Sequence, residues 1–308
     1  MAPHSGQSIP SQHTLSPLSS PSVTPPSCAR RVARATRDPD RPPRGLHAHC
    51  NYRGSVIDAS PGSLAFLLVA GLVAGAVNAV AGGGSLLVFP SLLAVGLPPL
   101  AANVTNSIAQ WPGYLGIIAG ARKDLKGQGR RVLLTSLVAA VGSAVGCALL
   151  LVLPSAVFDA VVPVLVLLAS AVFALQPLIR RWVAPTPGAP DRLATLLPSV
   201  FLAAVYGGYF GGALGVILIA TLSFFAHDTL VRLNALKGFL SLVVATVTVV
   251  YFSIGAPVDW FAVATLAPTT LVGGYVGARV ARRSPEAVLR AAVVLLGVAV
   301  GIYLLVSG

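Results

Sequence analysis

Charged residues are scarce in this sequence. Asp, Glu, Lys and Arg make up 10% of its 308 residues, whereas hydrophobic types make up 55%. Soluble domains carry roughly 25% charged residues, so a chain of this composition has too few to cover a surface that faces water. The shortage excludes an ordinary soluble globular enzyme and indicates a protein whose solvent is the lipid bilayer.

Cysteine is also rare, and Cys28, Cys50 and Cys147 have no metal-ligand spacing. We therefore predict neither a disulfide framework nor a metal site. The sequence has no catalytic Ser/His/Asp order, no pair of carboxylates deep within an apolar stretch and no Walker loop. We expect no catalytic residues and no cofactor, and we predict that the protein is not an enzyme.

The positive charge is unevenly placed. The net charge is +12, but many of the basic residues lie in short breaks between apolar stretches, so no nucleic-acid partner is expected. Residues 1–60 are rich in Ser, Pro and Arg and lack apolar periodicity, which predicts a disordered extension. Its basic run from Arg30 to Arg44 suits either a contact with anionic lipid or a solvated tail. It lacks the order of regions typical of a signal peptide.

The rest of the chain is a series of apolar stretches. Most are about 20 residues long, which is the length that a helix needs to cross roughly 30 Å of hydrocarbon. Backbone polar groups find no water there, so helices are expected. We predict an all-α polytopic membrane protein with about eight transmembrane segments. The predicted stretches are 64–80, 85–97, 101–121, 132–153, 157–177, 194–226, 230–252, 257–279 and 286–306.

The basic breaks constrain the topology. Arg122, Lys123, Lys126, Arg130 and Arg131 form one group, which the positive-inside rule places on the cytoplasmic side. The second group is Arg180, Arg181 and Arg192, and the third is Arg279, Arg282 and Arg283. With eight simple crossings the second group would also lie inside but the third would lie outside, which conflicts with the positive-inside rule. The conflict disappears if 64–97 and 194–226 are broken hairpins that enter and leave on one side.

Two related halves, residues 61–178 and 193–308, are predicted from matching sequence features. Each half has a glycine-rich break, an apolar segment, a polar turn and then an Asn-x-x-polar step. Gly84 precedes Asn103 by 19 residues, and Gly215 precedes Asn234 by the same number. At this offset Asn106 lies opposite Lys237. The broken hairpins would give the halves opposite orientations, as in many transporters, while chance similarity in an apolar sequence is the alternative.

The glycine breaks are the first candidates for a binding site. Glycine allows helices to unwind at membrane depth, which exposes backbone N–H groups that attract anions. The alternative is that glycine only lets helices pack closely. We place in the candidate site the break residues Gly82, Gly83, Gly84, Gly211 and Gly212.

Polar side chains within the apolar stretches complete the candidate site. Lys237 lies about two turns inside its stretch, where a buried ammonium faces a cavity or partner, unless it extends to the membrane surface. Gln110 is a further hydrogen-bonding group in these stretches. The amides and hydroxyl can bind solute oxygens or serve as interhelical hydrogen bonds. The candidate polar residues are Asn78, Asn103, Thr105, Asn106, Asn234 and Lys237.

The order and spacing of these motifs resemble the TauE/SafE family of sulfite-exporter-like membrane proteins. The resemblance rests on NAVAGGGSLLVFPSLLAVGLPPLAANVTNS, VYGGYFGGALG and NALKGFLSLVVA, together with the final GAPVDWFAVATLAPTTLVGGYVGARVARR. It covers roughly residues 63–306. It implies a multi-pass plasma-membrane transporter of small anions such as sulfite or sulfonates. The second break, GGYFGGALG, departs from the form frequent in relatives, which leaves the solute open.

The function expected from the sequence is secondary transport. We predict a carrier in the cell membrane that exports a small anion, such as sulfite or an organosulfonate, by alternating access. Its expected partners are that anionic solute and the lipid bilayer. The sequence leaves the oligomeric state open. Two alternatives stay open: a carrier of another small organic solute, and a membrane scaffold that transports nothing.

Overall fold

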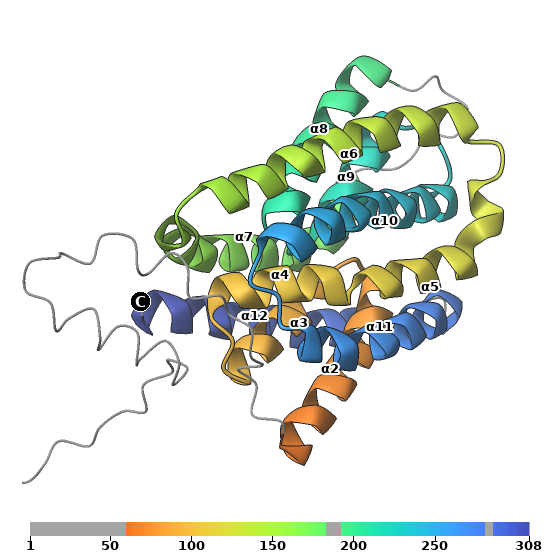
Figure 1. The fold of residues 1–308 in the computed structure, drawn as a ribbon. Helices are drawn as coiled ribbons and strands as arrows, with labels where there is room; N and C mark the ends of the chain where they lie inside the picture. Colours follow the sequence, from red (N-terminus) through yellow and green to blue (C-terminus); the bar gives the residue numbers. More distant parts are fainter. Residues whose placement is uncertain (1–59, 183–191, 281–285, 308) are drawn as a thin grey trace, which may run out of the picture. The chain divides into compact units, whose positions relative to one another are not determined.

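The computed structural model describes residues 60–182, 192–280 and 286–307, and they are helical apart from their connections (Figure 1). The predicted N-terminal extension, except for Ser60, and two members of the third basic group, Arg282 and Arg283, lie outside the described residues. The helices are α2 (Pro61–Val80), α3 (Ser85–Ala94), α4 (Pro99–Ala109), α5 (Trp111–Ala121), the short 3₁₀ helix η2 (Arg122–Leu125), α6 (Gly129–Val152), α7 (Ser155–Trp182), α8 (Leu193–Tyr209), α9 (Leu214–Phe225), α10 (Leu230–Gly255), α11 (Trp260–Val280) and α12 (Glu286–Ser307).

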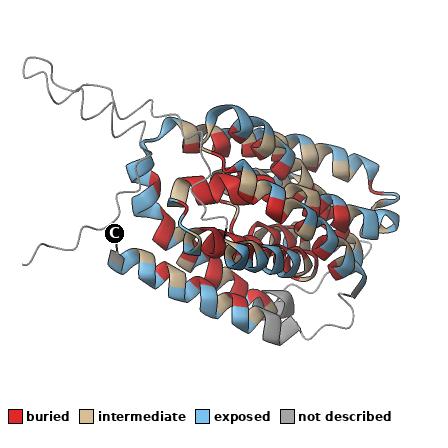
Figure 2. Cartoon of the chain, turned by 60° about the horizontal axis from the view of Figure 1, so that its bottom comes forward, coloured by how far each residue is buried: buried red, intermediate tan, exposed pale blue. Residues whose placement is uncertain are grey.

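The prediction of an all-α membrane protein is confirmed. Among the described residues, five helices are long and apolar enough to cross a bilayer: α2, α6, α7, α10 and α11. Many large apolar side chains point outward, and Val152, Ile254 and Val306 are more than 80% exposed. Buried residues gather where the helices face one another, while exposed residues follow their outer sides (Figure 2). Apolar surface of this extent suits lipid. The number of eight crossings stays a prediction.

Both predicted breaks interrupt helices. The first break, residues 81–84, separates α2 from α3, and the second break, residues 210–213, separates α8 from α9. In the first, the N–H groups of Ala81 and Gly82 both donate to the carbonyl of Val77. In the second, two successive N–H groups likewise share one carbonyl, that of Tyr206. Gly82 then has a φ of 85° and Gly211 a φ of 77°, a left-handed conformation that glycine adopts without steric cost.

The stretch 101–121, expected as one helix, is two helices. α4 ends at Ala109 and α5 begins at Trp111, with Pro112 in its first turn. Proline has no N–H to donate, and its ring crowds the carbonyl four residues earlier, so a helix cannot pass through it undisturbed. The corresponding helix of the second half, α10, has Val243 at this position and runs unbroken for 26 residues. Pro112 therefore accompanies a helix break in one half that the other half lacks.

The elements of the two halves correspond in order. Gly82 and Gly211, which share the same hydrogen bonding and backbone conformation, are 129 residues apart. The starts of α4 and α10 are 131 residues apart, because α9 is two residues longer than α3. The sequence register that paired Gly84 with Gly215 is therefore wrong by two residues at the break. Its pairings of Asn103 with Asn234 and of Asn106 with Lys237 agree with the helix starts.

The halves are interleaved in the packing. The first helix of each half packs most extensively against a long helix of the other half. α2 lies on α11, and α8 lies on α6. Backbones approach closely at small residues: Gly142 faces Phe201 and Gly146 faces Val205. The same register recurs in the other pair, where Gly273 faces Leu72 and Gly277 faces Ala76. Repeated close contacts at glycine are a usual basis of helix association in membranes.

These contacts also give the helix directions. In both crossings the residue numbers rise together, so α8 runs parallel to α6, and α11 runs parallel to α2. Ser143 contacts Val244 and Leu151 lies beside Gly255, so α10 also runs with α6. The contacts of α5 pass from Thr246 to Gly238 along α10 but from Thr270 to Ala278 along α11, so α11 runs against α10. The first helices of the two halves, α2 and α8, therefore run in opposite directions, which agrees with the predicted inversion.

The inversion brings basic residues to one end of the helices. Arg131, near the start of α6, pairs with Asp228 just before α10 at 2.9 Å. The N–H of Arg192, before α8, donates to the carbonyl of Phe225 at the end of α9, so this hairpin begins and ends together. Gly120 lies beside Ala278, so Arg279 is at this end too. At least one member of each of the three basic groups thus lies at this end, as the broken-hairpin topology predicts.

Candidate functional site

The two breaks meet in the interior of the protein. A Cβ atom placed on Gly215, at the start of α9, would lie 2.6 Å from the Cα of Gly82. Real side chains do not tolerate such a distance, so this contact requires glycine. Gly83 and Gly212 both lie against α7, where they face the ring of Phe173 and the methyl group of Ala169. The breaks therefore join the hairpins of the two halves to each other and to α7.

A buried hydrogen-bond network surrounds the first break, and Gln110 is its centre. Gln110 Nε2 donates to Ser85 Oγ at 2.8 Å and also to Asn106 Oδ1. Gln110 Oε1 accepts from Asn78 Nδ2 at 2.6 Å. Asn78 Oδ1 in turn accepts from the backbone N–H of Gly84 at 3.1 Å. The helix break leaves Gln110 between α4 and α5, from where its side chain links α2, α3 and α4.

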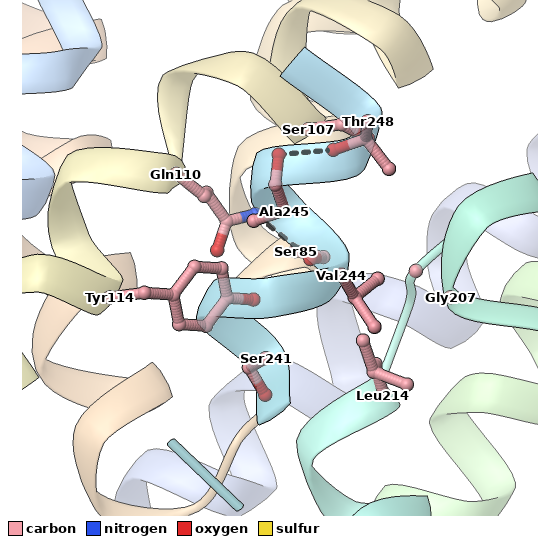
Figure 3. A pocket seen from close by; sticks show the side chains of 11 residues that line it. Ser85, Ser107, Gln110, Tyr114, Gly207, Leu214, Ser241, Val244, Ala245 and Thr248 are labelled. Atoms are coloured by element: carbon pink, nitrogen blue, oxygen red, sulfur yellow. Dashed lines mark hydrogen bonds between the residues drawn. The ribbon is translucent and has the colours of Figure 1, made fainter. Parts of the chain in front are cut away.

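A small cavity, here called the central cavity, opens beside this network (Figure 3). Its volume is about 20 Å³, and roughly 10–15 Å³ suffices for one water molecule. Gln110 and Tyr114 come from one side, Ser241 and Thr248 from the middle of α10, and Leu214 from the start of α9 (Figure 3). Its complete lining is Ser85, Ser107, Gln110, Tyr114, Gly207, Gly211, Leu214, Ser241, Val244, Ala245 and Thr248.

Corresponding residues of the two halves line the central cavity. Gln110 corresponds to Ser241 and Tyr114 to Ala245, at the offset that relates α4 and α5 to α10. Ser85 and Leu214, the first residues of α3 and α9, form a third pair. A space bounded by both members of several pairs lies on the pseudo-twofold axis between the halves. Residues there can face a solute from both halves at once.

Lys237 lies close to the central cavity but does not line it. Its side chain is 2% exposed. It precedes Ser241 and Val244 by four and seven residues, so it shares their face of α10, about 6 Å further along the axis at 1.5 Å per residue. Asn106, which corresponds to Lys237, bonds directly to the cavity residue Gln110. The predicted polar step therefore borders the cavity in both halves.

The remaining predicted residues lie around the cavity rather than in it. Asn103 Nδ2 donates to the carbonyl of Tyr209 at 3.0 Å, which ties α4 to the end of α8. Thr105 Oγ1 accepts from the N–H of Asp259 at the start of α11. Asn234 is half-buried on the first turns of α10. Of the predicted site residues, Gly211 is the one that lines the central cavity.

Most of the residues that line the cavity are not among those predicted from the sequence. Gln110 was recognised as a polar group in an apolar stretch but was not placed in the site. Ser85, Ser241 and Thr248 were not considered, because an isolated hydroxyl in an apolar helix gives little signal. One signal was available: Ser241 and Thr248 are seven residues apart, which places them on the same helix face as Lys237.

Comparisons with known proteins agree with this architecture. The family model described as sulfite exporter TauE/SafE matches residues 67–304. The probable membrane transporter protein ORF9 of Sinorhizobium sp is 27% identical over 79% of this chain and 92% of its own length. The probable membrane transporter protein of Haemophilus influenzae is 26% identical over 76% of this chain and 91% of its own.

A third relative is the probable membrane transporter protein YfcA of Escherichia coli K12. It is 28% identical over 74% of this chain and 83% of its own length. No solved structure gives a significant match. The family match begins within α2, includes both breaks and the central cavity, and ends within α12. The chain therefore belongs to the sulfite exporter TauE/SafE family of membrane proteins.

Proposed function

We propose that this protein is a secondary transporter that exports a small anion, such as sulfite or an organosulfonate, across the cell membrane by alternating access. The family membership and the relatives named as probable membrane transporters support a carrier rather than an enzyme. The single observation that carries the proposal is the central cavity, because residues of both inverted halves line it. A solute held there touches the two parts whose relative movement alternating access requires.

The proposed binding site combines the predicted residues with those of the cavity. The hydroxyl groups of Ser85 and Ser241 donate to the solute, Gln110 holds Ser85 in place, and the buried Lys237 supplies positive charge. Asn78 and Asn106 hold Gln110 in position. At about 20 Å³ the cavity has room for roughly one water molecule, so the proposal requires the halves to separate slightly when solute enters. The remaining predicted residues, at the breaks and on α4 and α10, position these groups.

Reconstitution of the full chain into liposomes tests the proposal. We expect efflux of at least one of sulfite, sulfate, thiosulfate and sulfoacetate above that from empty liposomes, and no efflux of a neutral solute. Replacement of Lys237 by alanine should reduce this anion efflux. Lys123→Ala is the matched control, because it removes an exposed lysine from η2.

Each contrary outcome supports a different function. Absence of efflux for every solute contradicts transport and favours a membrane scaffold. Efflux of a neutral solute that Lys237→Ala does not alter contradicts an anion carrier and favours a carrier of another small organic solute.

A further inference from the structure

An apolar groove, here called the outer groove, lies between α5 and α11, which run side by side (Figure 1). Its volume is about 420 Å³, far larger than that of the central cavity. The side chains of Leu115, Leu271 and Val272 in its lining are exposed on the outer surface, so the groove faces the surrounding lipid. The described residues that line it are Leu115, Gly116, Ala119, Leu271, Val272 and Tyr275.

Small residues on α5 keep the outer groove open. A Cβ atom on Gly116 would lie 2.6 Å from the carbonyl oxygen of Leu271, so the two backbones touch at this point. Gly116 also lines the groove, where it adds no side chain to the space. Ala119 lies three residues further along and contributes only a methyl group. A long, flexible apolar chain can therefore lie in the groove without moving either helix.

Positive charge lies at one end of the outer groove. Arg279, one helical turn beyond Tyr275, stacks on the Tyr275 ring, with 4.2 Å between the guanidinium carbon and the ring centroid. Arg122 directly follows α5 and lies at the same end, because Gly120 is beside Ala278. Both arginine side chains are exposed. A guanidinium that stacks on an aromatic ring keeps the N–H groups at its edge available for a phosphate.

Nearby carboxylates leave this end of the groove positive. Asp124 lies in η2, two residues after Arg122, and the exposed Lys123 beside it offsets its charge. Asp228 is held by Arg131 at 2.9 Å and by Arg232 at 3.3 Å. Within residues 60–182, 192–280 and 286–307, no ion pair joins Arg279 or Arg122 to a carboxylate. The positive-inside rule places this end at the cytoplasmic surface, where lipid headgroups lie.

We propose that the outer groove binds one phospholipid whose headgroup carries a net negative charge. An acyl chain lies against Leu115 and Leu271, and the phosphate lies at the edge of the Arg279 guanidinium. The surrounding lipid is as apolar as the groove, so the groove supplies packing and the arginines supply the preference for an anionic headgroup. This site does not depend on transport of any solute.

A second copy of the chain fits the outer groove less well than a lipid. Two copies related by a twofold axis along the membrane normal would place their grooves face to face with their basic ends at the same surface. Arg279 and Arg122 of each copy would then lie near the same residues of the other, and like charges repel. An anionic lipid instead brings the opposite charge to this end.

Phosphatidylglycerol and phosphatidylcholine with identical acyl chains are suitable probes, because they differ in net headgroup charge. Native mass spectrometry of the detergent-solubilised full chain, titrated with each lipid, measures the affinity of the first lipid that binds. Phosphatidylglycerol should bind at least about fivefold more tightly, as expected for one well-placed arginine. Equal affinity for the two lipids would overturn the proposal.

Two variants separate the charge from the groove. Arg279→Gln should weaken binding of phosphatidylglycerol by about fivefold and leave phosphatidylcholine unchanged, because a single positive charge is lost. Ala119→Phe should weaken binding of both lipids, because the ring occupies the outer groove. The matched control is Arg130→Gln, which removes an exposed arginine from the same end but away from this groove. It should change the affinity for phosphatidylglycerol by less than about twofold.

Three outcomes would overturn the proposal. The first is a loss for Arg279→Gln no larger than that for Arg130→Gln. The second is unchanged binding of phosphatidylglycerol to a folded Ala119→Phe variant. The third is a dimer that binds no phosphatidylglycerol and that Ala119→Phe converts to a monomer, because the groove would then be an interface between copies. If size-exclusion chromatography shows that Ala119→Phe does not fold, the comparison of Arg279→Gln with Arg130→Gln decides, since both side chains are exposed.

Discussion

The two halves of this protein share a backbone arrangement but differ in the chemistry they present to the central cavity. Both have a hairpin broken by a left-handed glycine, Gly82 in one and Gly211 in the other. The first half offers a connected amide network around Gln110, whereas the second offers the short side chain of Ser241. Helix packing is thus repeated while side chains diverge. Substitutions at corresponding positions should therefore have unequal effects.

The largest effect is expected where the two hairpins touch. A valine at position 215 would place its Cβ 2.6 Å from Gly82 Cα and 2.9 Å from Gly82 O. Both are backbone atoms with little freedom to move, so Gly215→Val should cost about 3 kcal/mol or more of folding free energy. Thermal unfolding and size-exclusion chromatography of the detergent-solubilised protein would measure the loss.

The matched control is Gly129→Ala, because a Cβ atom on Gly129 meets nothing within 4 Å. It should unfold at nearly the same temperature as the unmodified protein. An unfolding temperature for Gly215→Val as high as that of Gly129→Ala would show that the hairpins do not touch as described.

A smaller but unequal effect is expected from the corresponding pair Gln110 and Ser241. Gln110→Ala removes the partner of Asn78 and Ser85 and leaves buried polar groups unpaired, which costs about 1–3 kcal/mol. Ser241→Ala removes a single hydroxyl from the edge of the cavity and should cost less than about 1 kcal/mol. Unfolding of both variants under identical conditions measures the difference. Equal losses would mean that the amide network does not distinguish the halves.

The smallest effect is expected at Ala213, the residue that precedes α9. Ala213 has a φ of 55°, which is unfavourable for any residue with a Cβ atom, whereas the corresponding Gly84 has a φ of −59°. Ala213→Gly should stabilise the protein by up to about 1 kcal/mol, because it relieves this strain. Chemical or thermal unfolding would measure the gain.

The corresponding change, Gly84→Ala, should have the opposite sign. Its added Cβ would lie 2.4 Å from the carbonyl oxygen of Ala74 and 2.9 Å from Asn78 Cγ, so it should destabilise the protein strongly, as Gly215→Val does. Destabilisation by Ala213→Gly would indicate that the lost methyl contacts outweigh the strain.

Much of the architecture followed from simple sequence signals. The scarcity of charge predicted a membrane protein, the paired glycine clusters predicted both breaks, and the basic residues predicted hairpins that return to one side. The single helix expected over 101–121 was wrong, because the effect of Pro112 within an apolar run was not considered. The register at the breaks was wrong by two residues, because the different lengths of α3 and α9 are not visible in a count from glycine to asparagine.

The sequence by itself determined that the protein lies in lipid, that it is helical and that the order of its elements is repeated. These properties depend on composition and on local backbone preferences. Only the tertiary structure decided which residues border the central cavity. Gln110, Ser241 and Leu214 are far apart in the sequence. They meet because α2 packs on α11 and α8 packs on α6, which interleaves the two halves. Contacts of this kind depend on close approach at small residues such as Gly142 and Gly277, and no local pattern specifies which helix will be the partner.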